Sequence, residues 1–403
     1  MTLSAEKNIE TEIISFCSMS EIQIIQIESS YDKKRFLQFP WLLYKNDPYW
    51  IPMLRDEQKS LVNYVKHPFY DRNECQTFLA VKGSEVVGRI AAIFNLGHVE
   101  RYKENIGFFG FFESINDTEV SHCLFDAAFD WLKKKGMIIM RGPVNPSLNH
   151  TLGLLIDGFD STPFFMMTYN PPYYERLLNE YGFHKSQDLF SFWGKIDMLP
   201  KIRERFVPMA KVIAEKTGAI VRPLDRRNFA RDVELFLNIY NRSLTNTWGF
   251  VPMSEAELKD MTAGLKYLIV PELAVGVEIN GQLVGAAFGL PDYNPRIREI
   301  NGRLFPFGFL KLLRHKDQIK RIRILSTNVL PEYQMHGLAL LLLEGLVPKA
   351  IESGIQEAEF SWVLESNRFS RGSLEKGGAI RNKTFRIYDY PEIGRDSLTL
   401  LGQ

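Results

Sequence analysis

The chain carries the same β-hairpin pattern twice, and this repeat restricts its fold more than any other feature. The first hairpin spans residues 78–94 and the second spans residues 273–290. Each has a Val-Gly pair early in its second strand, Val87-Gly88 and Val284-Gly285. The second hairpin turns at Asn280-Gly281, a pair that suits the left-handed conformations of a two-residue turn.

A second pair of landmarks has almost the same spacing. Two short helical patterns end at glycine, one at Gly182 and the other at Gly378. Gly285 follows Gly88 by 197 positions, and Gly378 follows Gly182 by 196 positions. Two independent landmarks with nearly equal offsets indicate a duplicated unit.

Both halves show one order of elements: leading helices, the hairpin, a third strand, a helix, a further strand, a short helix and a final strand. A hairpin followed by strand–helix–strand is typical of a mixed sheet with helices packed on it. The fold class is therefore predicted to be α/β (an α+β mixed sheet) with two tandem domains, 21–200 and 201–403. Residues 1–20 have no hydrophobic pattern, and disorder is one interpretation of them.

Composition narrows the functional classes. A formal net charge of +1 gives no general attraction to nucleic acid, and we predict no nucleic-acid partner. The three cysteines, Cys17, Cys75 and Cys123, form no CxxC pair, which indicates free thiols and no metal site. The N-terminal residues do not resemble a signal peptide, and no apolar run approaches the ~20 residues of a membrane span. We therefore expect a cytoplasmic protein.

The segment after the strand at 322–330 carries the chemistry. Residues 331–339 read PEYQMHGLA and lead into a strongly apolar helix. The first N–H groups of a helix lack partners inside the helix, and its dipole adds partial positive charge there. Gly337 and Ala339 have little or no side chain, so this segment is predicted to bind a diphosphate through its backbone. A plain strand–helix turn, with Gly337 relieving packing, is the alternative.

With Gln334, Gly337 and Ala339 in these positions, the segment resembles the Gln/Arg-x-x-Gly-x-Gly/Ala signature of the GNAT superfamily of acyl-CoA N-acyltransferases. Downstream, Asn367 and Ser370 also match that family, as do three positions of the stretch 373–378. The specific motifs cover about residues 220–390. Over residues 25–195 the resemblance is one of element order alone. Over its whole length the chain resembles bacterial tandem-GNAT proteins, a group that includes enzymes acylating long-chain amines such as sphingoid bases.

The resemblance implies that acetyl-CoA or a longer acyl-CoA is the co-substrate, with no metal, and that a primary amine attacks the thioester directly. The pyrophosphate would lie on the amides of residues 335–339, and the pantetheine along the end of the preceding strand. The residues implied to bind CoA are Asn328, Val329, Leu330, Gln334, Met335, His336, Gly337, Leu338, Ala339, Asn367 and Ser370.

The chain departs from the family pattern at two places. The tyrosine that often protonates the leaving thiolate in this family is Leu374 here. The first half has no phosphate loop, and Asp117 at the start of its matching helix would cap that helix and repel phosphate. The first half is therefore expected to be a scaffold or a wall of the acceptor pocket.

Two residues are candidates for catalysis. Glu365, near the end of an apolar strand, is the predicted general base, and Tyr388, in the last strand, is the predicted acid. An exposed ion-paired carboxylate and a packed tyrosine are the alternatives, and Glu278 and Glu299 are weaker candidates for the base. His150 lies in a long Gly- and Pro-bearing stretch, where ordinary loop packing is the favoured interpretation.

The segment 296–323 combines nine Lys or Arg residues with Phe305, Phe307 and Phe309. A basic rim around an apolar tip is typical of peripheral membrane contact, and it also suits a lipid-like amine or a long acyl chain. A solvated insertion is the alternative. Two other functions stay open: an aminoacyl-tRNA-dependent transferase, which needs no pyrophosphate loop, and a non-catalytic regulator that binds acyl-CoA.

Overall fold

The computed structural model describes residues 13–16 and 21–391. The prediction for residues 1–20 lies outside these ranges, except that Ile13–Phe16 form a strand. The first half contains strands β1 (Ile13–Phe16), β2 (Ile22–Gln26), β3 (Glu74–Lys82), β4 (Glu85–Phe94), β5 (Ile106–Ser114), β6 (Ile139–Gly142), β7 (Val144–Asn145), β8 (Thr151–Leu152), β9 (Leu154–Asp157) and β10 (His184–Lys195). Its helices are α1 (Ser30–Leu43), α2 (Arg55–Leu61), α3 (Leu96–Tyr102), α4 (Thr118–Lys134) and α5 (Tyr174–Tyr181).

The second half repeats this order. Its strands are β11 (Ile220–Pro223), β12 (Ala274–Ile279), β13 (Gln282–Pro291), β14 (Arg321–Val329), β15 (Glu357–Leu364) and β16 (Ile380–Tyr390). Its helices are α6 (Leu199–Thr217), α7 (Phe229–Ser243), α8 (Glu255–Leu265), α9 (Asn294–Glu299), α10 (Gly308–Leu313), α11 (Leu338–Glu352) and α12 (Arg368–Lys376). Both predicted hairpins are present, and Asn280 and Gly281 have φ values of +52° and +74° at the second turn. The predicted α/β fold with a duplicated unit is confirmed.

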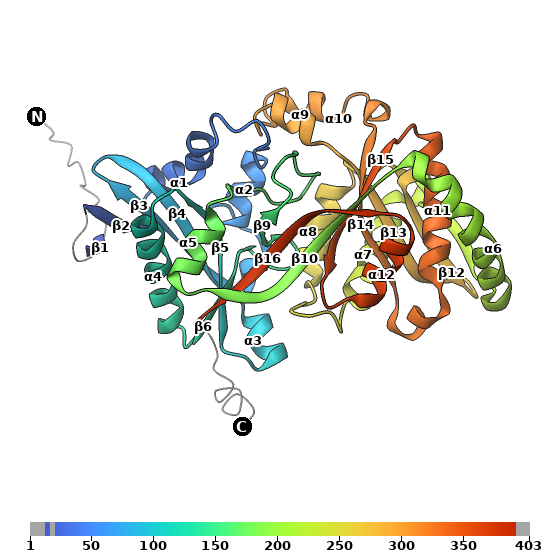
Figure 1. Ribbon diagram of the computed structural model, residues 1–403, viewed down its shortest axis with the longest axis horizontal. Coiled ribbons are helices and arrows are strands. Elements are labelled where there is room, and N and C mark those ends of the chain that lie inside the picture. Colours follow the sequence, from blue (N-terminus) through green and yellow to red (C-terminus); the bar gives the residue numbers. More distant parts are fainter. Residues whose placement is uncertain (1–12, 17–20, 392–403) are drawn as a thin grey trace, which may run out of the picture.

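A single large sheet joins the halves, in the order β1-β2-β3-β4-β5-β6-β16-β10-β15-β14-β13-β12-β11, with β9 also paired to β16. The last strand of each half pairs with a strand of the other half. β16, from the second half, pairs with β6 of the first half, and β10, from the first half, pairs with β15 of the second half. The long strands β10 and β16 run side by side across the middle of Figure 1. The boundary between two domains at residue 200 stays a prediction. Strands from both sides of this boundary belong to the same continuous sheet.

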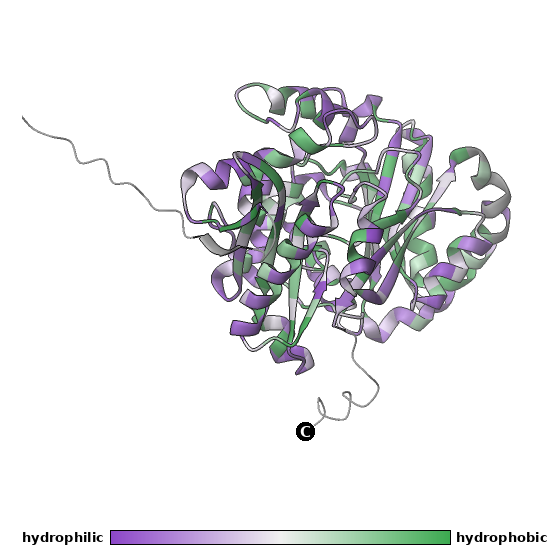
Figure 2. Ribbon diagram, turned by 60° about the vertical axis from the view of Figure 1, so that its left-hand side comes forward, coloured by the Kyte–Doolittle hydropathy of each residue, from purple (hydrophilic) through white to green (hydrophobic). Residues whose placement is uncertain are grey.

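In the second half, helices cover both faces of the sheet. A Cβ built on Gly276 of β12 would meet Phe236 of α7, whereas one built on Gly285 of β13 would meet Leu342 of α11. Gly276 is paired with Ala286, the residue after Gly285, and neighbouring residues of a strand point to opposite faces. Thus α7 lies on one face and α11 on the other, with α6 packed outside α11. Figure 2 shows the apolar strands inside and polar helix surfaces outside.

Within the described residues, no helix is long and apolar enough to cross a bilayer. The same residues, 13–16 and 21–391, contain no group of three or more His, Cys, Asp or Glu side chains that could hold a metal ion.

Candidate active site

The parallel strands β14 and β15 form a fork. They pair only where Arg321–Ile324 lies beside Glu357–Phe360. Beyond Ile324 the strands separate, because β14 continues along β13 while β15 continues along β10. A cavity of about 740 Å³ is lined by residues from both arms of this fork and from α6, α7, α8, α11 and α12. The fork therefore opens a path between the two faces of the sheet.

The predicted phosphate loop borders this cavity. A 3₁₀ turn, Pro331–His336, lies between β14 and α11, in the segment that the sequence places between the strand and the helix. Gly337 has a φ of +74° and is the N-cap residue of α11, which has no side-chain cap. The amide of Leu340 donates to the carbonyl of Gly337 at 3.0 Å. The amides of Leu338 and Ala339 are therefore the ones that keep the capacity to bind an anion.

Gly337 and Gln334 have structural roles in the loop. A Cβ on Gly337 would lie 2.8 Å from Cδ1 of Ile213 in α6, so any larger residue would be both strained and crowded. The side-chain amide of Gln334 donates to the carbonyl of Val329 at 3.1 Å and to that of Ser243 at 3.2 Å. Gln334 thereby ties the loop to the end of β14 and to the end of α7.

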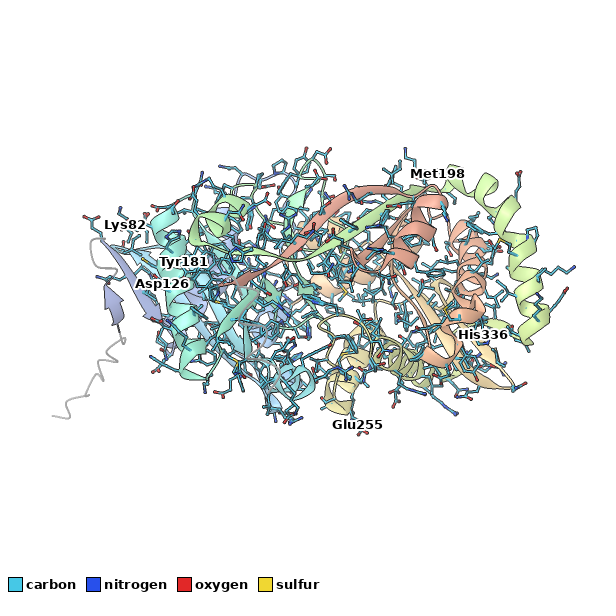
Figure 3. All side chains as sticks on the ribbon, turned by 60° about the horizontal axis from the view of Figure 1, so that its bottom comes forward. Lys82, Asp126, Tyr181, Met198, Glu255 and His336 are labelled. Atoms are coloured by element: carbon cyan, nitrogen blue, oxygen red, sulfur yellow. The ribbon has the colours of Figure 1, made fainter. Side chains whose placement is uncertain are left out.

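The structure separates the residues predicted to bind CoA into three groups. Those that line the cavity are Asn328, Gln334, Gly337, Ala339, Asn367 and Ser370. The core residues are Val329, Leu330 and Leu338. Met335 and His336 are exposed on the loop, and Figure 3 labels His336 at the surface of the second half. Asn367 caps α12, its side-chain oxygen accepting the amide of Ser370 at 3.0 Å.

Four buried polar atoms on the cavity wall have no hydrogen-bond partner in the described structure. They are Nε of Arg203, Oγ of Ser326, Nδ2 of Asn328 and Nε1 of Trp362. A buried polar group without a partner costs about 1–3 kcal/mol, so such groups indicate a missing ligand or water. The amide and indole nitrogens can only donate, which favours a ligand with carbonyl oxygens.

Neither predicted catalytic residue lines the cavity. Glu365 is partly exposed and forms an ion pair with Lys185 at 2.7 Å. Tyr388 is buried in the core of the first half, where its hydroxyl lies 3.2 Å from Glu175. Burial is the main cause that raises the pKa of the Tyr388 hydroxyl well above its ordinary value. Leu374 does line the cavity, so the position of the family's tyrosine offers no acid here.

The first half also supplies residues of the cavity wall. Strands β7 and β8 form a small hairpin, and its turn brings Leu148, Asn149 and His150 to the wall. The side-chain amide of Asn149 donates to the carbonyl of Val251 at 2.9 Å, which fixes the turn against the second half. The only sequence feature that drew attention to His150 was its location in a long loop, and that feature favoured a role in loop packing over a role in the site.

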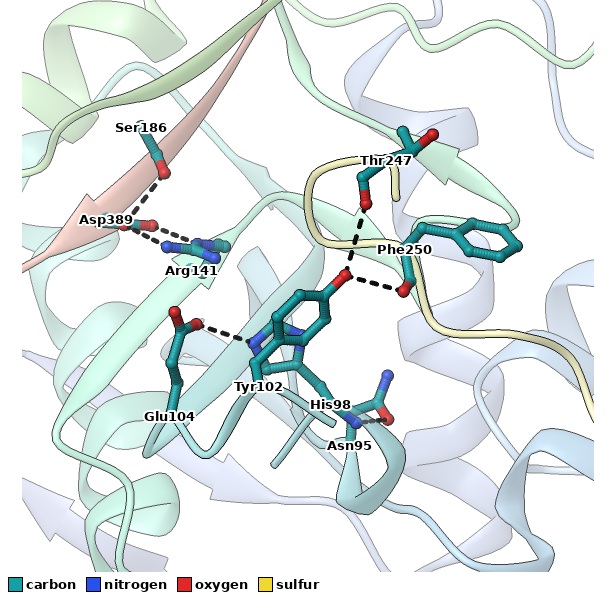
Figure 4. A network of polar contacts seen from close by, with 9 residues as sticks. All are labelled: Asn95, His98, Tyr102, Glu104, Arg141, Ser186, Thr247, Phe250 and Asp389. Carbon is teal, nitrogen blue, oxygen red and sulfur yellow. Dashed lines mark hydrogen bonds and ion pairs between the residues drawn. The ribbon is translucent and has the colours of Figure 1, made fainter. Parts of the chain in front are cut away.

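Contacts between the halves hold another part of the wall (Figure 4). The hydroxyl of Tyr102, in α3, donates to the carbonyl of Phe250 at 2.9 Å. The segment that it holds contributes Thr247, Trp248 and Phe250 to the cavity. The guanidinium group of Arg141 lies 4.9 Å from the ring centre of Trp248 and also pairs with Asp389 of β16.

The equivalent place in the first half is filled by its own side chains. Asp117 caps α4 by accepting the amides of Glu119 and Val120, as predicted. At the end of β5, the amide of Ser114 donates to the hydroxyl of Tyr174 at 2.9 Å, and the hydroxyl of Tyr173 donates to its carbonyl. The backbone groups that could receive a ligand are thus already paired.

Comparison with known proteins gives the same fold. No family model matches the chain. A tandem GNAT protein from the clavulanic acid biosynthesis pathway superposes with a TM-score of 0.53 at 11% identity, covering 92% of this chain and 100% of that one. A GCN5-related glucosamine N-acetyltransferase region of a fungal multi-domain protein gives 0.54 at 10% identity, covering 92% of this chain and 38% of the other.

Two relatives are similar over nearly the full chain. Protein YghO of Escherichia coli is 35% identical over 366 residues, which cover 89% of this chain and 92% of the relative. Bacterial ceramide synthase of Caulobacter vibrioides is 33% identical over 378 residues, which cover 92% and 97%. The chain thus has the fold of the tandem GNAT class. Within that class the chain belongs to the family of protein YghO and bacterial ceramide synthase.

Proposed function

We propose that the protein transfers an acyl group from acyl-CoA to the nitrogen of a primary amine. One observation carries this proposal: the uncapped start of α11 and the unpaired donors of Asn328 and Trp362 border the same cavity. The helix start suits the pyrophosphate, and the donors suit the carbonyl groups of pantetheine and of the thioester.

The proposed acceptor is a long-chain amine of the sphingoid type. The cavity wall beside the fork is mostly apolar, with Met261 and Leu265 from α8 and Trp248 and Phe250 from the preceding loop. A pocket of about 300–1,000 Å³ with apolar walls and a few polar groups is typical of small-molecule sites. The name of the Caulobacter relative, a ceramide synthase, supports this acceptor class.

A thiol-release assay tests the proposal. Acyl-CoAs of several chain lengths are mixed with short and long amines, and free CoA thiol and the amide product are measured. Amine-dependent thiol release with a matching amide supports the transferase. Acyl-CoA binding without release supports the regulator instead. Transfer from aminoacyl-tRNA, without acyl-CoA binding, supports the alternative donor.

The proposed location is the cytoplasmic face of a membrane. Phe305 and Phe307 are 73% and 70% exposed, Phe309 and Leu310 are also exposed, and Arg303 and Lys311 lie beside them on the surface. Apolar tips with basic neighbours fit an anionic bilayer. Flotation with phosphatidylserine vesicles should carry the protein, whereas phosphatidylcholine vesicles should carry less. If a Phe305→Ser/Phe307→Ser variant floats as well as the wild type, this surface is not the membrane contact.

A further inference from the structure

The β7–β8 hairpin of the first half has a fixed position in the cavity wall of the second half. On one side it packs tightly on β5, since a Cβ on Gly110 would lie only 1.8 Å from the carbonyl oxygen of Val144. On the other side, a Cβ on Gly249 would lie 2.8 Å from the side chain of Leu148. The turn between the strands therefore places its side chains in the cavity without room to shift.

His150 is the histidine at the end of this turn. Its Nδ1 lies 2.9 Å from Oγ of Ser147, which is buried. The amide of Asn149 donates to the same hydroxyl oxygen at 3.3 Å. The hydroxyl oxygen of Ser147 accepts the Asn149 amide, and its second contact has two possible arrangements: it accepts the Nδ1 proton of His150, or it donates its own proton to Nδ1. In the first arrangement Nε2 is the acceptor nitrogen of the ring.

The surroundings keep the ring neutral. Burial first, and then the nearby ring of His67, lower the pKa of His150 to about 3. The two ring centres are 5.7 Å apart. Nδ1 of His67 accepts the amide of Phe69 at 3.1 Å, and its Nε2 lies 3.7 Å from Asp260. His67 thus directs its own N–H toward Asp260, and His150 stays free of a carboxylate partner.

The two carboxylates on the wall are already engaged. Glu344 faces Arg203 at 3.7 Å, and Glu357 accepts the indole N–H of Trp193 at 3.1 Å. Among the lining residues, His150 is the only histidine. A neutral imidazole with a free ring nitrogen can accept a proton, and its lowered pKa makes His150 a weaker base than an exposed histidine.

We propose that His150 is the base that accepts the proton of the acceptor amine, an inference that rests on the proposed function. The amine nitrogen bonds to the thioester carbonyl carbon, and its proton passes to Nε2 of His150. The C–S bond breaks, and its electron pair leaves with sulfur. The proton then passes from His150 to the thiolate or to water, which gives one amide and one free CoA thiol.

This proposal gives the first half a chemical role. The half that lacks the phosphate loop would supply the proton acceptor, while the second half holds the acyl donor. The cavity is complete only when both halves are folded together. Ser147 is then a positioning residue, because it acts through the orientation of the ring.

The test compares His150→Gln, His150→Ala and Ser147→Ala with His122→Gln, a matched control on α4 that does not line the cavity. In the His150 variants kcat should fall by a factor of roughly 10²–10⁴, because a positioned base is lost. Acyl-CoA affinity should stay at the wild-type value, which also shows that the variants fold. Ser147→Ala should lose less, and His122→Gln should keep the wild-type kcat.

Added imidazole gives a readout that a purely structural role would not change. His150→Ala should regain part of its kcat with imidazole in the assay, and the regain should increase with the fraction of neutral imidazole. A His150→Gln enzyme with the wild-type kcat overturns the proposal. A slow His150→Ala enzyme that binds acyl-CoA normally but does not respond to imidazole also overturns it. If the wild type acylates no amine, the proposed function fails, and the inference fails with it.

Discussion

The carboxylate of Asp389 receives two hydrogen bonds from the guanidinium group of Arg141, at 2.7 Å from Nε and 2.8 Å from Nη2. The two residues are 248 positions apart in the chain and lie on the adjacent strands β16 and β6. Asp389 also accepts the hydroxyl of Ser186 in β10 at 3.0 Å. One carboxylate therefore ties the last strand of the second half to two strands of the first half.

Replacing this carboxylate should destabilise the whole protein. Asp389→Ala leaves the largely buried Arg141 without its partner, and we expect the free energy of unfolding to fall by about 3 kcal/mol. The exposed pair of Lys66 and Asp71 offers a control, and Asp71→Ala should cost less than about 1 kcal/mol. Urea unfolding measures both, and equal losses would contradict the prediction.

Gly337→Asp should weaken acyl-CoA binding by at least about tenfold, because it puts negative charge at the start of α11. Gly281→Asp is a matched control, since Gly281 has the same φ of +74° in an open turn. Gly337→Ala separates the crowding against Ile213 from the effect of charge. Calorimetric titration with acyl-CoA gives the affinities. If Gly337→Asp binds acyl-CoA with the wild-type affinity, the loop is not part of the binding site.

Each chain should bind one acyl-CoA. In the first half Asp117 occupies the start of α4, and Tyr173 and Tyr174 occupy the end of β5. Asp117→Ala should lower stability by about 1 kcal/mol through loss of the cap, without changing the stoichiometry. A second binding event, seen by calorimetry in either protein, would show that the first half also takes the ligand.

Asp188 should make stability sensitive to acid. Burial favours its neutral form, but hydrogen bonds from Arg386 and Lys185 outweigh burial and keep the pKa of Asp188 below its ordinary value. Because the folded pKa is the lower one, the ionised group stabilises the fold above about pH 4, and this contribution is lost as the pH falls further. Unfolding followed against pH should be steeper below that point for the wild type than for Asp188→Asn. Parallel curves would contradict the assignment.

Leu265→Trp should shift the enzyme toward shorter substrates. Leu265 lines the cavity from α8, and a larger ring there would fill space that a hydrocarbon chain needs. The rate with long-chain amines or acyl-CoAs should fall more than the rate with short ones. Leu235→Trp, on the partly exposed surface of α7, should leave the chain-length profile unchanged. A uniform loss across all lengths would argue that the change only disturbs folding.

Local sequence patterns predicted most elements of the fold. The Asn280-Gly281 turn, the Asp117 cap and the Gly182 helix end are each specified by a few neighbouring residues, and all are present. The exchange of β10 and β16 was not predicted. Any extended strand with the right side chains can pair with a free sheet edge, so nothing local in the sequence identifies the partner.

The position of the loop around Gly337, between β14 and α11 and beside the cavity, could be predicted because it depends on consecutive residues, and its part in binding CoA stays a prediction. Glu365 was chosen because its strand is apolar, and the long-range ion pair with Lys185 could not be read from that pattern. His150 was left among packing residues because its approach to the cavity depends on a hairpin from the other half. Contacts between residues a hundred or more positions apart decided both cases.

The exchange of final strands also limits how this chain can be divided. Cutting it near residue 200 would leave β15 without β10 and β6 without β16, and each fragment would expose an unpaired sheet edge. Such edges favour aggregation. We therefore expect two separately expressed fragments to be insoluble alone and to recover function only when produced in the same cell. A gene of this family would then be inherited and recombined as one piece.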